Sequence, residues 1–218
     1  MENYNISSVN YNNIVNKINK FSIVVANYYK IEMQDLRHYH FTNYCKDVLD
    51  FTFIEYDFKT KLNNVLAGTT FKQDEIIVIC INQNMIESRK NFTRMHEITH
   101  AVFHAKGDLN QNFAEYIDKK QYTYQDYQYE LEADYGASLL IANDMVINEC
   151  LEKKLTFEEI KVMLQCSKQA LQNRLINYFY FTVKLPYKKA KQIVFDYSFK
   201  FNKVLLYEFN LWKFSNIL

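Results

Sequence analysis

The hydrophobic pattern of the first fifty residues predicts two helices. Apolar residues recur at intervals of three or four over about residues 10–29, which is the spacing of an amphipathic helix. A second helix is predicted from about residue 34 to residue 49. The apolar positions of the first helix are Ile14, Ile18, Phe21 and Val25.

After residue 50 the pattern changes to the two-residue period of β-strands. Apolar and charged residues alternate from Ile54 to Lys59, which is typical of a half-buried strand. A second strand is predicted over residues 65–71, and the β-branched run Ile76–Ile81 predicts an interior third strand. A helix over about residues 92–105 follows. The sequence therefore predicts an α+β fold in which a small sheet packs on this helix.

The last third of the chain predicts helices and then a hairpin. Thr156-Phe157-Glu158-Glu159 is a capping box that opens a helix reaching about Leu164, and Ser167 can cap the next helix. Two helices joined by so short a turn resemble a helix-turn-helix. Beyond Pro186, apolar and polar residues alternate over residues 195–211, which predicts a terminal β-hairpin packed on the body.

Composition excludes several classes of protein. Three glycines and one proline among 218 residues exclude collagen-like and low-complexity chains, and also a glycine-loop nucleotide binder. No apolar run approaches the about 18 residues that span a bilayer, and the four cysteines form no C-x-x-C pair. We therefore expect a cytoplasmic protein with reduced cysteines and no membrane partner. The net charge of +1 hides +7 on residues 151–218 and −6 on residues 1–150.

The sharpest local pattern is an H-E-x-x-H motif in the helix predicted after the sheet. His96 and His100 lie four residues apart, on one helical face, so that both imidazoles can reach one metal ion. Glu97 projects beside them, where it could touch the attacking water without being a ligand. The alternative is that the motif occurs by chance, and a third ligand is needed to decide between a metal site and a chance match.

An acidic segment thirty residues later supplies candidates for that third ligand. Glu130 and Asp134 share a helical face by their spacing, while Glu132 points away from it. Glu130 could complete a His–His–Glu zinc site, and Asp134 could accept the remaining N–H of a ligating histidine. Asp126 and Glu132 are the rival ligands, and an ordinary solvated acidic face is the alternative to all of them.

A zinc site with a third histidine is excluded by the residues that follow the motif. Phe103 and Lys106 stand where such a site requires glycine and histidine. His104 continues the stripe of His96 and His100, but the axial drift of the helix takes it away from the metal. We interpret His104 as a packed or hydrogen-bonded histidine.

Residues 91–104, Asn-Phe-Thr-Arg-Met-His-Glu-Ile-Thr-His-Ala-Val-Phe-His, followed by Glu130-x-Glu132-Ala133-Asp134, resemble the ImmA/IrrE family of metallo-endopeptidases. The resemblance covers roughly residues 50–180 and implies a zincin-like core that binds Zn²⁺. It implies His96, His100 and Glu130 as metal ligands and Glu97 as the general base. Two positions depart from the family pattern. Thr99 stands where the family usually has glycine, and Gly136 where it usually has phenylalanine.

These features divide the chain into a zinc metallopeptidase domain over residues 1–150, a helix-turn-helix-like segment over 151–185 and an aromatic-rich extension over 186–218. The family implies an endopeptidase whose protein substrate is a helix-turn-helix transcriptional repressor of a mobile element or stress response. One alternative is a non-proteolytic regulatory protein that contains zinc and binds a repressor or DNA. Direct DNA binding through residues 156–180 is a third hypothesis, which the few basic residues on the second helix disfavour.

Overall fold

A computed structural model describes residues 7–59, 65–105, 111–116, 124–199 and 203–215. The chain begins with the long helix α1 (Ser8–Tyr29), whose first turn is capped because the Ser7 hydroxyl accepts a hydrogen bond from the Asn10 amide at 3.2 Å. The second predicted helix is split into a short 3₁₀ turn (Met33–Asp35) and α2 (His38–Asp47). The break falls at residues 36 and 37, where the backbone is extended.

A four-stranded sheet follows, in the order β1-β3-β2-β4. The first three strands, β1 (Thr52–Tyr56), β2 (Leu66–Gln73) and β3 (Ile76–Asn82), confirm the sequence prediction, and β3 is an interior strand. Strand β1 runs parallel to β3, while β2 is antiparallel to both of its neighbours. The edge strand β4 (Gln111–Tyr116) was not predicted.

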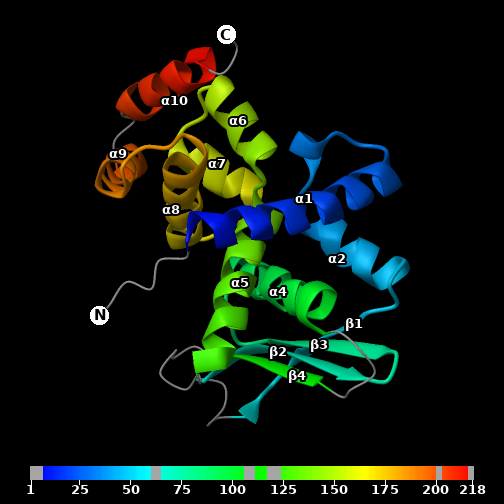
Figure 1. Ribbon diagram of the computed structural model, residues 1–218. Helices are drawn as coiled ribbons and strands as arrows, with labels where there is room; N and C mark the ends of the chain where they lie inside the picture. The colour runs from blue at the N-terminus through cyan, green and yellow to red at the C-terminus, as the bar shows by residue number, and fades with distance from the viewer. Residues whose placement is uncertain (1–6, 60–64, 106–110, 117–123, 200–202, 216–218) are drawn as a thin grey trace.

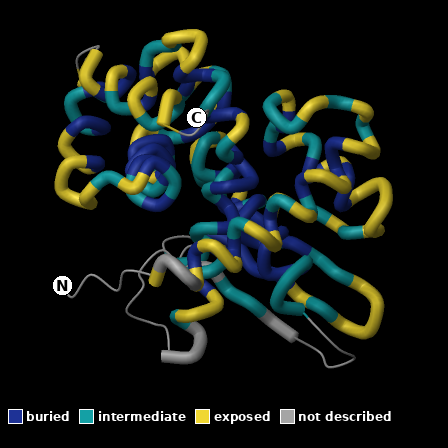
Figure 2. Tube along the Cα trace, turned by 45° about the horizontal axis from the view of Figure 1, so that its top comes forward, coloured by how far each residue is buried: buried dark blue, intermediate teal, exposed yellow. Residues whose placement is uncertain are grey.

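The helix that carries the H-E-x-x-H motif lies along one face of this sheet (Figure 1). Helix α4 (Glu87–Thr99) begins five residues before the predicted start and continues into a π turn (His100–His104). It packs against α5 (Tyr124–Ile141), which holds the acidic segment. The seam between them is lined by small and medium apolar side chains and lies in the buried centre of the molecule (Figure 2). These side chains are Met95, Ile98, Ala133 and Ala137.

The described residues after α5 are mostly helical. They comprise α6 (Asp144–Glu152), α7 (Phe157–Leu164), α8 (Lys168–Asn177), a π turn (Tyr178–Thr182), α9 (Tyr187–Phe199) and α10 (Lys203–Ser215). The capping box at Thr156 and Glu159 is confirmed, as is the cap of α8 by Ser167. Among the described residues no helix combines the length and the apolar character that crossing a bilayer requires. All four cysteines are free.

The predicted terminal hairpin is wrong, because residues 195–199 belong to α9 and 203–211 to α10. Each of these helices buries an apolar stripe at helical spacing, with Tyr197 on α9 and Leu205 and Phe209 on α10 among the buried residues. Further apolar side chains face outward, Phe199 and Tyr207 among them. Residues two apart in sequence point to nearly opposite faces of a helix. A helix with apolar residues on both faces can therefore show the two-residue period of a strand.

A buried cation joins the C-terminal helices to the rest of the molecule. Arg174 on α8 is 2% exposed; its Nε donates to the carbonyl oxygen of Ala142 at 2.5 Å, and its guanidinium pairs with Asp144. Asp144 also accepts a hydrogen bond from the Thr182 hydroxyl at 2.9 Å. Because a buried charge is costly unless paired, these contacts fix α8 against the start of α6.

The two departures from the family pattern touch each other across the seam between α4 and α5. A Cβ atom built on Gly136 would lie 2.6 Å from Cγ2 and 2.7 Å from Oγ1 of Thr99. The absence of a side chain at Gly136 leaves room for Thr99, so that the helices keep their close approach.

We expect Gly136→Ala to lower the free energy of unfolding by about 1–3 kcal/mol, because the added methyl group overpacks the seam. In a Thr99→Ala background the cost should be smaller, because only Cβ of residue 99, at 3.2 Å, still crowds the added methyl group. Alanine also favours a helix over glycine by about 0.5–1 kcal/mol, which offsets part of the remaining cost. Denaturant unfolding of the four proteins of this double-mutant cycle measures the coupling. An equal cost of Gly136→Ala in both backgrounds would contradict the contact.

Candidate metal centre

Three side chains from α4, the π turn and α5 meet at one point. Nε2 of His96 lies 3.1 Å from Nε2 of His100, and each of these nitrogens lies 3.1 Å from an oxygen of Glu130. One ligand atom from each residue fits within 4.8 Å of the others. Neighbouring ligands of a tetrahedral ion with bonds of 2.0–2.1 Å are about 3.3 Å apart. The cluster therefore fits a metal ion, and the two nitrogens and one carboxylate are a donor set that suits zinc.

The three side chains are buried, and burial sets their charges. His96, His100 and Glu130 are 1%, 0% and 6% exposed. Burial lowers the pKa of His100 to about 4, so its imidazole is neutral and keeps a lone pair for a metal. Burial opposes ionisation of Glu130, but hydrogen bonds with His100 and His96 outweigh it and hold the pKa of this carboxyl well below its usual range. A neutral imidazole and an ionised carboxylate are the protonation states in which these side chains bind metal ions.

Asp134 contacts the first histidine from behind, as the sequence predicted. Its Oδ1 lies 3.2 Å from Nδ1 of His96, while Nε2 of the same ring faces the cluster. When Nε2 holds a metal, the proton of the ring must be on Nδ1, which faces the carboxylate of Asp134. Asp134 is thus the carboxylate that can set the tautomer of His96 when a metal is bound.

The second histidine is oriented by a different group. Nδ1 of His100 lies 2.9 Å from Nδ1 of His104, and Nε2 of His104 lies 3.4 Å from Oε2 of Glu132. Glu132 in turn pairs with Lys17 of α1 at 3.4 Å. A metal on Nε2 of His100 puts the proton of that ring on Nδ1, which then donates a hydrogen bond to Nδ1 of His104. His104 must therefore carry its own proton on Nε2, which faces Glu132. This series of contacts positions His100 and connects it to α1.

An aromatic wall completes the surroundings of this pair. The His100 ring stacks on Phe113 of the edge strand β4, with centroids 4.7 Å apart and an angle of 21°. Tyr129 lies beside the His104 ring, with centroids 5.0 Å apart. These rings restrict both imidazoles to few orientations, which suits groups that must present a nitrogen lone pair to an ion.

Glu97 lies beneath strand β2. It is 0% exposed, and its Oε2 accepts a hydrogen bond of 2.6 Å from the Thr70 hydroxyl. Gly68 lies above the same carboxylate, where a Cβ atom would come within 2.9 Å of Oε1 of Glu97. The strand can pass this close to α4 because position 68 has no side chain, and Thr70 then orients the carboxylate.

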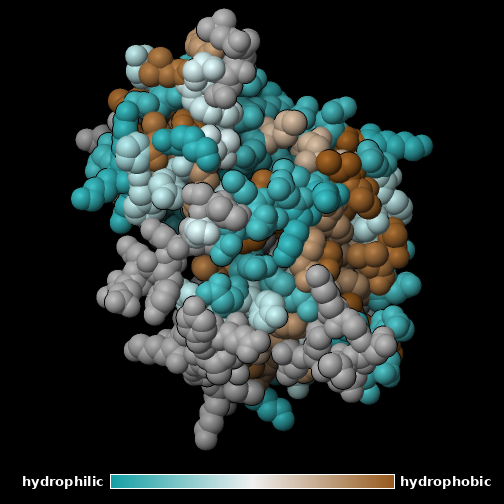
Figure 3. Space-filling model, in the orientation of Figure 1, coloured by the Kyte–Doolittle hydropathy of each residue, from teal (hydrophilic) through white to brown (hydrophobic). Residues whose placement is uncertain are grey.

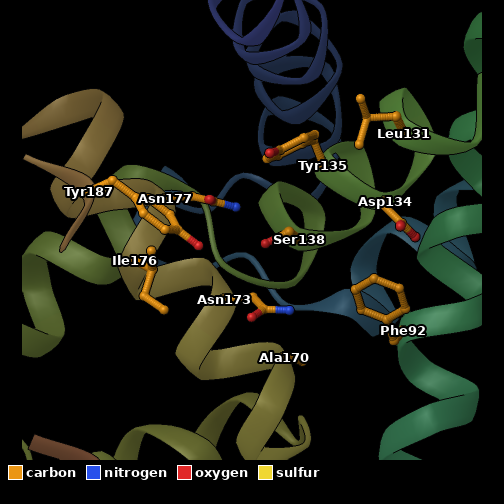
Figure 4. Close-up of a pocket in the computed structure, with 10 residues that line it drawn as sticks. All are labelled: Phe92, Leu131, Asp134, Tyr135, Ser138, Ala170, Asn173, Ile176, Asn177 and Tyr187. Atoms are coloured by element: carbon orange, nitrogen blue, oxygen red, sulfur yellow. The ribbon is translucent and has the colours of Figure 1, made fainter. Parts of the chain in front are cut away.

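A cavity of about 250 Å³ lies behind Asp134, between α4, α5, α8 and the start of α9 (Figure 4). Asp134 and Phe92 border one side of it, and Asn177 and Tyr187 border the other. None of the three clustered ligands lines this cavity. It is therefore separate from the metal centre, although Asp134 contacts both.

The buried set of two histidines and one carboxylate defines a candidate metal-binding protein. The sequence model of the Peptidase_M78 family, described as the IrrE N-terminal-like domain, matches residues 57–176, more than half of the chain. The chain therefore belongs to this family, which supports a metallopeptidase-type function. No curated protein matches the chain significantly.

The structure brings together the sequence-predicted residues His96, His100 and Glu130, and it places Asp134 against His96. Of the rival ligands, Glu132 contacts His104 instead of the cluster, and the side chain of Asp126 lies outside the described part. The sequence interpretation correctly described His104 as hydrogen-bonded but missed its link to Glu132. It also missed Thr70, because no local pattern ties a strand threonine to a glutamate 27 residues away.

We expect His104→Phe to weaken metal binding by about 10–100-fold, the usual effect of losing the group that orients a ligating histidine. Phenylalanine keeps a ring beside Tyr129 but cannot accept the proton of His100. Competition with a chromophoric chelator measures the affinity for Zn²⁺ or Co²⁺. Tyr129→Phe is the matched control and should bind metal like the wild type. Unchanged affinity in His104→Phe would show that the contact with His104 does not position His100.

Proposed function

We propose that the protein is a zinc-dependent endopeptidase. The main support for this proposal is the buried cluster of His96, His100 and Glu130 in a chain of the Peptidase_M78 family. A buried carboxylate at Glu97, next in sequence to the first ligand, supports hydrolysis over a purely structural metal site, since a structural site needs no base. A cytoplasmic location stays a prediction.

In the proposed reaction Glu97 moves the proton. Zinc, when bound by His96, His100 and Glu130, supplies positive charge that polarises the scissile carbonyl and acidifies water. Thr70 holds Oε2 of Glu97, so we assign proton transfer to Oε1. Glu97 accepts a proton from the attacking water and delivers it to the amide nitrogen as the C–O bond forms and the C–N bond breaks.

The proposed substrate is a helix-turn-helix transcriptional repressor, as the family resemblance implies. The helix pair α7 and α8 is better suited to a protein partner than to DNA. Of the two basic residues on α8, Arg174 is buried in its pair with Asp144, and Lys168 alone is exposed. One exposed cation is too few for a helix that reads DNA through phosphate and base contacts. The helix-turn-helix-like character of this pair also stays a prediction.

Glu97→Gln tests the proteolytic mechanism. The variant should bind zinc with unchanged stoichiometry, because Glu97 is not a ligand, and cleave a repressor encoded beside the gene about 10²–10⁴-fold more slowly. Zinc is measured by elemental analysis of the dialysed protein, and cleavage by mass spectrometry of the products.

The control is Glu75→Gln, the same substitution at an exposed position in the turn between β2 and β3. It should change neither zinc content nor cleavage. If Glu97→Gln retains zinc and cleaves at the wild-type rate, the mechanism is wrong. A wild-type protein that binds the repressor tightly without cleaving it would instead favour the non-proteolytic regulatory alternative.

A further inference from the structure

Helix α10 has a second apolar face that the fold leaves exposed. Its inner face buries Leu205, Leu206 and Phe209 at 8% exposure or less. Its outer face presents side chains that are between 45% and 71% exposed. These outward side chains are Val204, Tyr207, Leu211 and Phe214, here called the α10 stripe. Scattered exposed apolar residues are common in proteins, but four in one row on a single helix mark a contact surface.

The α10 stripe has the spacing of a coiled-coil seam. Its members follow one another at intervals of three, four and three residues, which are the alternating a and d positions of a heptad. Val204 and Leu211 take the a positions, and Tyr207 and Phe214 take the d positions. A helix that only packs on its own protein needs no such second seam.

In a parallel pair of α10 helices, the residues that flank the stripe on one copy would face residues of complementary character on the other. In this register Lys203 is at position g and Glu208 at position e of the following heptad. In parallel two-stranded coiled coils, g of one helix faces e five residues later on the other, so Lys203 would meet Glu208 of a second copy. Asn210 and Ser215 form the next such pair, and both are polar and exposed. Glu208 also pairs with Lys189 of its own chain at 2.7 Å, and its side chain is 14% exposed, so Lys203 of the second copy would share this carboxylate with Lys189.

An antiparallel pair would lack this complementarity. In that arrangement like flanks face each other, which would bring the Glu208 flank of one helix against the Glu208 flank of the other. The pairing of Lys203 with Glu208 therefore favours a second copy in the parallel direction.

The position of α10 in the fold leaves room for a second copy. The helix lies at the outer edge of the molecule, and apolar atoms are visible over it at the upper left of Figure 3 (Figures 1 and 3). Phe209, which is 1% exposed, takes position f, the side opposite the seam. The body of each protomer would thus lie behind its own α10, on the side away from the partner.

We propose that two copies of the chain associate through their α10 stripes as a parallel helix pair about a twofold axis. The contact extends along 13 residues, or about 20 Å of helix, so the dimer is weak and concentration-dependent. The proposed dimer does not depend on the metal centre or on the proposed peptidase activity.

Sedimentation of the full chain over roughly 1 µM to 1 mM, which covers weak association, tests the contact. The wild type should shift from monomer to dimer, and Leu211→Asp should weaken the dimer by about 30-fold or more, as loss of a central contact residue does. The matched control is Val162→Asp, which places the same charge at an exposed apolar position on α7 and should leave the association unchanged. A wild type that stays monomeric throughout overturns the proposal, as does a Leu211→Asp protein that dimerises normally.

Disulfide trapping tests the direction of the pair. In a parallel pair, each a residue faces its own symmetry mate, so Leu211→Cys should form a 211–211 cross-link under mild oxidation. The wild type serves as its control, since Cys45, Cys150 and Cys166 are buried and Cys80 is partly buried. Lys203→Glu should weaken the dimer further in low salt than in high salt, because it faces Glu208. Cross-linking of Tyr207→Cys to Leu211→Cys, without any 211–211 product, would overturn the parallel arrangement.

Discussion

Helices α4 and α5 approach closely where Thr99 of one faces Gly136 of the other, and the metal centre lies beside that contact. His100 follows Thr99 directly, and Glu130 lies less than two turns before Gly136 on the opposing helix. The ligand atoms are 3.1 Å apart, so a shift of even 1 Å between the helices would spoil the cluster. Ligand geometry in this protein is therefore a consequence of helix packing.

Burial gives the site its chemistry. Glu97, Glu130 and Asp134 bring three carboxyl groups close to two histidines whose metal-facing nitrogens are almost inaccessible. A divalent cation among them would offset the mutual repulsion of these carboxylates and their loss of hydration. The Nδ1 atoms of the two histidines face unlike groups, a carboxylate for His96 and an imidazole for His100. Local electrostatics thus favour a cation in the same position to which the packing directs the ligands.

Residues close in sequence were easier to predict than residues brought together by folding. The spacing of His96 and His100 on one helix, and the helical face shared by Glu130 and Asp134, follow from the period of an α-helix, and the structure agrees. Thr70 and the link from His104 to Glu132 depend on how a strand and a second helix pack on α4. Strand β4 was missed because its six residues lack an alternating pattern of their own.

The error at the C-terminus has a physical cause. Residues two apart on a helix lie about 200° apart, so an apolar series such as Tyr207, Phe209 and Leu211 must place members on opposite faces. Phe209 enters the core, while the other two face outward and belong to the α10 stripe. A strand would have needed only one apolar face to produce the same pattern. The alternation that imitated a hairpin is thus the mark of a helix with a core on one side and an apolar surface on the other.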